Sequence, residues 1–84
     1  MDRKDERKVE VHGMEYTVRM TWDSEASVWV AESDDILGLV MEGGSIDALI
    51  ERVRFAAPEL LALNKQQPCD SILFLVEKRE KVPA

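Results

Sequence analysis

The chain has 84 residues, of which 45% are hydrophobic and 33% are charged, and its formal net charge is -6 at pH 7. This is the length of one domain, and a domain so small buries only about 60% of the surface that its unfolded chain exposes, so self-association would stabilise it. The composition is that of a folded domain and excludes a disordered chain. The negative charge argues against direct nucleic-acid binding, which depends on clustered Lys and Arg, and favours a basic partner.

Several classes of site are not supported by the residues present. Cys69 and His12 are the single cysteine and histidine of the sequence, so neither an internal disulfide nor a His/Cys metal set is expected. No apolar run reaches the length of a membrane span, and the first eight residues lack the apolar stretch of a secretory signal. We therefore expect a cytoplasmic protein that contacts no membrane and holds no cofactor or metal.

The chain divides into an arm, a domain and a tail. Residues 1–8 mix acidic and basic side chains without an apolar anchor, which predicts a flexible charged arm. Residues 9–77 carry the apolar periodicities of a single α+β domain. Residues 78–84 are mostly charged and include Pro83, so they are expected to form a tail.

The first strands are indicated by alternation of apolar and polar residues. A pattern that begins at Val9 changes phase at Met14, which predicts a bulge or tight turn at His12-Gly13. His12 is expected to be a surface turn residue there, because no nucleophile is identifiable near it. The strand from Glu15 to Trp22 has the clearest alternation, with one face towards water.

A hairpin is expected next. The polar linker 23–27 separates the first strand from a second one over residues 28–33, and the two should pair antiparallel. Two registers remain open. In one, Trp22 faces Trp29 and the indoles pack together; in the other, Trp22 faces Val28, and Trp29 turns to the opposite face of the sheet.

The pattern then changes from strand to helix. After a turn over residues 34–38, a short third strand from Leu39 to Glu42 ends at Gly43-Gly44, and Ser45 is placed to cap a helix. Apolar residues recur after it at helical spacing: Ile46, Leu49, Ile50, Val53 and Ala57. This spacing predicts an amphipathic helix that packs on the sheet.

The last elements are a second helical piece and a closing strand. Proline removes a backbone donor, so we expect a break or kink near Ala56 to Pro58, followed by a short helical piece over Glu59 to Leu63. The strand from Ser71 to Glu77 contains Ile-Leu-Phe-Leu-Val without alternation. Such a run is typical of a strand covered on both faces, here by the helix and by a second copy of the chain. The predicted fold is therefore a three-stranded antiparallel meander, one helix and a closing strand.

Several motifs are specific enough to suggest a family: Trp22-Asp23, Val28-Trp29-Val30-Ala31, Ser33-Asp34-Asp35-Ile36, Gly38-Leu39, and Pro58 directly before Glu59-Leu60-Leu61-Ala62-Leu63-Asn64. With this order of elements, residues 15–76 resemble the HicB-like antitoxins, in particular a short single-domain branch of mostly uncharacterised bacterial proteins. The resemblance implies a degenerate ribonuclease H-like fold without nuclease chemistry that masks a HicA-type toxin, a small basic ribonuclease.

The sequence departs from that family in two places. Leu37 stands where the family usually has Pro before the turn glycine, which could loosen the turn without removing it. The chain also ends at Ala84 without the C-terminal DNA-binding domain that typical HicB antitoxins carry. Operator binding by this chain alone is therefore not expected.

Five residues form the candidate partner-binding site: Glu32, Asp34, Asp35, Glu42 and Trp29. We interpret the carboxylates as an acidic docking face for a basic protein. The alternatives are a solvated turn and a two-metal nuclease site, which would need carboxylates that converge on ions about 4 Å apart. Reversing Asp34 and Asp35 to Lys is expected to leave folding intact and to weaken capture of a basic partner.

We therefore expect a HicB-like antitoxin, or an antitoxin-derived protein-binding module, that masks a small basic HicA-type ribonuclease. No catalytic constellation is present in the sequence pattern, so an enzyme is not expected. The alternative is a stand-alone oligomeric domain that binds a small ligand or another regulator without catalysis. In both cases the chain is expected to form a homodimer or a higher assembly.

Overall fold

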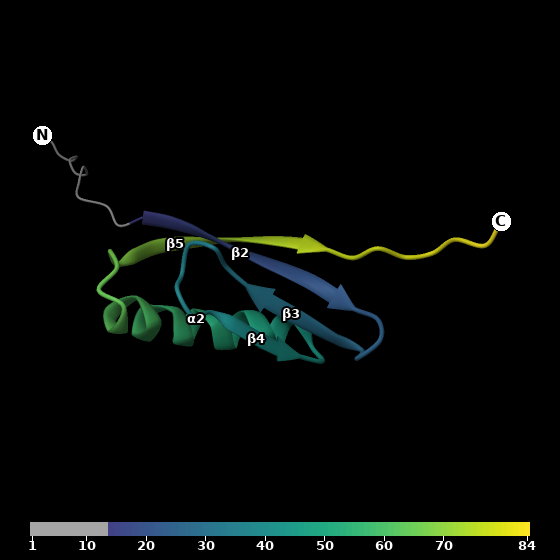
Figure 1. The fold of residues 1–84 in the computed structure, drawn as a ribbon, viewed down its shortest axis with the longest axis horizontal. Coiled ribbons are helices and arrows are strands. Elements are labelled where there is room, and N and C mark those ends of the chain that lie inside the picture. Colours follow the sequence, from purple (N-terminus) through teal and green to yellow (C-terminus); the bar gives the residue numbers. More distant parts are fainter. Residues whose placement is uncertain (1–13) are drawn as a thin grey trace, which may run out of the picture.

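The computed structural model describes residues 14–84. The bulge expected at His12-Gly13 and the arm expected over residues 1–8 lie outside the described residues. The elements within the described part are β2 (Met14–Asp23), β3 (Val28–Glu32), β4 (Val40–Gly43), α2 (Ile46–Leu63) and β5 (Cys69–Glu77) (Figure 1). This order confirms the α+β prediction of three strands, one helix and a closing strand.

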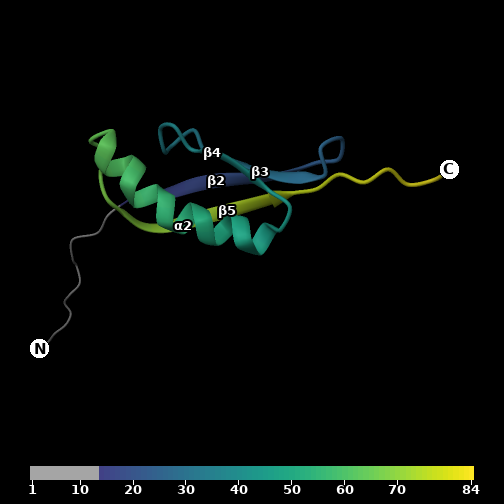
Figure 2. The same cartoon turned by 90° about the horizontal axis from the view of Figure 1, so that it is seen from below.

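The four strands of the described part form one sheet in the order β4-β3-β2-β5. β2, β3 and β4 pair antiparallel as a meander, and β5 pairs parallel with β2 on the other side. The helix α2 carries the chain from β4 at one edge back to β5 at the opposite edge (Figures 1 and 2). A strand that joins a sheet in parallel needs such a crossover.

The hairpin between β2 and β3 adopts the first of the two expected registers. Trp22 faces Trp29, and their ring centroids lie 5.4 Å apart at an interplanar angle of 61°. This edge-to-face geometry is favoured for aromatic pairs. Asp23 closes the turn, because its Oδ1 accepts hydrogen bonds from the amides of Glu25 at 3.0 Å and Ala26 at 3.2 Å.

The core lies between the sheet and α2. Ten hydrophobic residues are buried there: Tyr16, Val18, Met20, Ala31, Ile36, Leu39, Leu49, Val53, Ala57 and Leu61. The helix begins as expected, with the Oγ of Ser45 accepting a hydrogen bond from the amide of Ala48 at 3.3 Å. Across residues 14–84, no helix is both long and apolar enough to cross a bilayer.

The predicted break near Pro58 is wrong, because α2 is one continuous helix from Ile46 to Leu63. Pro58 removes one amide donor from the helix interior, which is unfavourable locally. Ala57 and Leu61, on either side of it in the chain, are buried against the sheet at 0% and 2% exposure. Burial of the flanking turns therefore outweighs the local cost of the proline.

Among residues 14–84, the closing strand β5 is an edge strand, and the helix covers one of its two sides. Ile72 and Phe74 pack against the core. Leu73 and Leu75, which alternate with them, are 44% and 46% exposed on the other side. The unbroken apolar run predicts a strand that is covered on both faces, and the described part of the chain covers one of them.

Candidate protein-docking face

Within residues 14–84, one face of the sheet has no helix packed on it (Figures 1 and 2). In β2 the side chains of Val18 and Met20 are buried towards α2, so Arg19 between them projects to the opposite side. We call this side the open face. It includes the following residues, which alternate with the core-facing ones: Glu15, Thr17, Arg19, Thr21, Asp23, Val28, Val30, Glu32, Val40, Glu42, Ser71, Leu73, Leu75 and Glu77.

The pairing of the strands places acidic and apolar side chains side by side on the open face. Glu32 lies opposite Val40 on β4 and opposite Arg19 on β2. In the next row, Val30 lies opposite Glu42. Val40 is 71% exposed, which is high for a β-branched aliphatic residue. The open face thus combines exposed apolar surface with two carboxylates that the sequence singled out.

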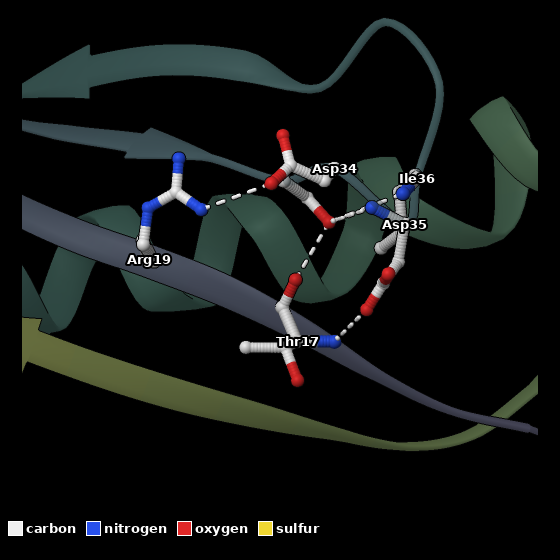
Figure 3. A network of polar contacts seen from close by, with 6 residues as sticks. Thr17, Arg19, Asp34, Asp35 and Ile36 are labelled. Atoms are coloured by element: carbon white, nitrogen blue, oxygen red, sulfur yellow. Dashed lines mark hydrogen bonds and ion pairs between the residues drawn. The ribbon is translucent and has the colours of Figure 1, made fainter.

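Asp34 lies at the rim of the open face. Its Oδ2 pairs with the Nη1 of Arg19 at 3.2 Å, and its side chain is 88% exposed (Figure 3). Such an exposed ion pair contributes little to folding. Asp34 is therefore available to a partner at small cost.

Asp35 has a different role, although it is adjacent in sequence. Its Oδ2 accepts a hydrogen bond from the amide of Thr17 at 2.8 Å (Figure 3). The Oγ of Ser33 donates to the carbonyl of Thr17 at 2.6 Å, and it accepts from the amides of Asp35 at 3.0 Å and Ile36 at 3.1 Å. These side chains satisfy the backbone of β2 where its pairing with β3 has ended. Asp35 is thus a structural residue, and the expectation that it can be reversed without loss of folding does not follow from this geometry.

Two residues that follow α2 also form hydrogen bonds with the loop between β3 and β4. Gln66 accepts a hydrogen bond from the amide of Leu37 at 3.0 Å and donates one to the carbonyl of Asp35 at 2.7 Å. Asn64 donates to the carbonyl of Leu37 at 3.1 Å. Sequence reasoning missed both side chains, because they lie 27 to 31 residues further along the chain than the groups that they hold.

The structure does not bring Trp29 together with the predicted carboxylates. Its indole packs against Trp22 and the core, on the side of the sheet that α2 covers. Glu32 and Glu42 project from the open face. Of the five predicted residues, two therefore lie on the open face, Asp34 at its rim, Asp35 within the loop network, and Trp29 on the opposite side.

Residues 15–83 match the family model described as a domain of unknown function, DUF1902. The chain belongs to the DUF1902 family. The DUF1902 chain is also similar to the crystal structure of the hypothetical protein TTHA1013 from the extremely thermophilic bacterium Thermus thermophilus. The two are 32% identical with a TM-score of 0.66, over 84% of this chain and 100% of that chain. No protein of curated function matches the chain.

Among residues 14–84, no group of three or more His, Cys, Asp or Glu side chains is arranged to hold a metal ion. Burial raises the pKa of the Cys69 thiol above its ordinary value of 9.0, although hydrogen bonding to the backbone opposes the shift. The Sγ of Cys69 lies 3.0 Å from the carbonyl of Ser71, to which the protonated thiol donates. Cys69 is therefore a neutral packing residue at physiological pH.

Proposed function

We propose that this DUF1902 chain is a HicB-like protein-binding module that masks a small basic ribonuclease of the HicA type. The observation that carries the proposal is the open face, where Val30 and Val40 lie exposed or partly exposed beside Glu32 and Glu42. Apolar contact area with a polar rim is the usual composition of a protein interface. A chain with a net charge of -6 attracts a basic partner and speeds their encounter.

The edge at β4 offers a specific point of contact for a basic side chain. A hollow of about 420 Å³ is lined there by Asp23, Val30, Val40, Met41, Glu42 and Arg52. A lysine or arginine of the partner that entered it would meet Glu42 as counter-ion and Val40 as an apolar wall. In this arrangement the carboxylates set the rate of capture, and the valines set the lifetime of the complex.

A ligand-binding module is the second candidate. The hollow between α2 and β5 favours it, because residues from both elements line a space of about 260 Å³. Pockets that bind small molecules usually measure about 300–1,000 Å³ and enclose most of the ligand. This hollow falls below that range. The larger hollow at the β4 edge is bordered by the exposed Val40 and Glu42 of the open face, so we assign it to protein docking, which we favour.

The proposal is tested by tagging the chain, purifying it from its native cells at low salt, and identifying co-eluting proteins by mass spectrometry. We expect one small basic protein in stoichiometric amount, released by high salt. A growth-rescue assay then shows whether that protein is toxic and whether this chain relieves the toxicity.

Two double variants separate docking from general electrostatics. Glu32→Lys with Glu42→Lys changes the open face, and Glu51→Lys with Glu59→Lys makes the same change of charge on the exposed side of α2. We expect the first pair to weaken capture at least about tenfold and the second to leave it nearly unchanged. Equal capture by the two variants, or the absence of any basic partner, would contradict the proposal.

A further inference from the structure

The two edges of the sheet are unequally protected. The β4 edge has only four residues, carries Glu42, and has the carbonyl of that residue occupied by the Nη1 of Arg52 at 3.0 Å. Short length, charge and side-chain cover are the features that keep an edge from pairing with another chain. These features disfavour strand addition at the β4 edge.

In the described part of the chain, the β5 edge has none of these features along its centre. The strand has nine residues, and the five from Ile72 to Val76 are all apolar. Leu73, Leu75 and Val76 are 44%, 46% and 51% exposed. A long apolar edge without charge or proline is a template for another strand, and folded proteins normally cover it.

We propose that the occupant of this edge is β5 of a second copy of the chain, paired antiparallel across a two-fold axis. The two four-stranded sheets then form one continuous sheet. Such an axis stands perpendicular to the sheet, so the open faces of both copies lie on the same side. The proposal concerns the edge alone and does not depend on the identity of any toxin.

The sequence of β5 selects one register for this pairing. Two residues that face each other across a pair of strands project from the same face of the sheet, and successive residues of a strand project from opposite faces. In this dimer the two-fold axis must therefore pass through a residue of β5 and not between two residues. With the axis at Phe74, that residue faces its own copy, Leu73 faces Leu75, and Ile72 faces Val76. Each apolar side chain from Ile72 to Val76 then meets an apolar side chain of the second copy.

Neighbouring registers lose this match. An axis at Leu73 places Asp70 opposite Val76, and an axis at Leu75 places Glu77 opposite Leu73. In the Phe74 register, Asp70 of one copy instead faces Lys78 of the other. Lys78 lies in exposed contacts that can rearrange, with its Nζ 3.1 Å from Glu80 and 5.0 Å from the ring centroid of Trp22.

The helix side of β5 also accommodates a second copy. The hollow of about 260 Å³ between α2 and β5 is lined by Arg54 and Pro58 from the helix and by Ile72 and Phe74 from the strand, among others. A strand added to the edge lies about 4.8 Å beyond β5. In the proposed register this places Phe74 of the second copy beside the hollow, so the interface continues from the strand pair into the helix layer.

The oligomeric state of the full chain tests the proposal, measured by sedimentation over a concentration series. Leu75→Lys and Val40→Lys form a matched pair, because both residues are exposed on the open face in the same cross-strand row, at opposite edges of the sheet. We expect a dimer whose dissociation constant rises at least about tenfold with Leu75→Lys and is unchanged with Val40→Lys. Circular dichroism confirms that both variants fold.

A cross-linking experiment tests the register and does not rely on a disruptive substitution. In a Cys69→Ser background, Leu73→Cys and Leu75→Cys are prepared separately. Facing residues in an antiparallel pair have Cα atoms about 4.5–5.5 Å apart, within the range of a disulfide, whereas identical positions are displaced along the strands by two residues. Mild oxidation of the mixture should therefore give cross-linked dimers in large excess over either variant alone. A monomer at every concentration, equal weakening by both lysine variants, or stronger cross-linking of one variant with itself would overturn the proposal.

Discussion

The two adjacent aspartates of the loop after β3 should differ sharply in their effect on stability. Asp35→Ala removes the acceptor of the Thr17 amide, a hydrogen bond of 2.8 Å to a charged group. Such bonds contribute about 1.5–3 kcal/mol, and the exposed position of this one places it at the lower end, about 1.5 kcal/mol. In a domain of this size, that loss lowers the melting temperature by about 6–12 °C.

Asp34→Ala is the matched control, because it removes a carboxylate of the same type from the next position in the chain. Its ion pair with Arg19 is exposed, so we expect a loss below about 0.5 kcal/mol. Urea unfolding followed by the fluorescence of Trp22 and Trp29 measures both variants. Equal midpoints for the two variants would refute the assignment of Asp35 to the fold and of Asp34 to the surface.

Three further predictions concern the helix and the thiol. Pro58→Ala should raise the free energy of unfolding by about 1–2 kcal/mol in urea titrations, because it returns an amide donor to a continuous helix; no gain would indicate two helical pieces. Ser45→Ala should lower it by about 1 kcal/mol through loss of the cap at the start of α2, and a loss near zero would show that the cap is unimportant. Cys69 should react with an alkylating reagent more slowly than free cysteine at pH 8, and equally fast once the chain is unfolded. Because burial raises the pKa of this thiol in the folded chain, the stability due to its neutral form is present below 9.0 and declines as the pH rises above it.

The elements of the fold were predictable where one periodicity dominates a segment. The alternation along β2 and the helical spacing of Leu49, Val53 and Ala57 each allow one packing against a single core. The cap at Ser45 is equally local, since donor and acceptor lie three residues apart. Local signals of this kind are sufficient where the interacting groups are close in sequence and share one periodicity.

The prediction at Pro58 failed because local preference was opposed by tertiary packing. The missing amide of Pro58 favours a break in the helix. The opposing stabilisation comes from burying Ala57 and Leu61 against the sheet, and this depends on tertiary packing that the local sequence does not show. The hairpin register was undecided for a related reason. Both Trp22 opposite Trp29 and Trp22 opposite Val28 satisfied the hairpin, and the structure selects the first.

The candidate site was only partly predictable, because charge alone does not distinguish a docking residue from a structural one. Asp34 and Asp35 have the same side chain in the same loop. Only Asp35 accepts a hydrogen bond from a backbone amide of β2, whereas Asp34 pairs with the side chain of Arg19. The hydrogen bonds of Gln66 to the loop between β3 and β4 depend on the position of the C-terminal end of α2 in the folded chain. No pattern in the sequence indicates that contact.

The association rate with the co-purified basic protein tests the central claim most directly. It should be measured at about 0.01 M and about 1 M salt, where charges are screened beyond about 30 Å and about 3 Å respectively. The account predicts that Glu32→Lys with Glu42→Lys slows association at low salt by clearly more than the helix control, which makes the same change of net charge, and that both differences from wild type vanish at high salt. A rate that is insensitive to the open-face variant at low salt would contradict the claim that this face captures a basic partner.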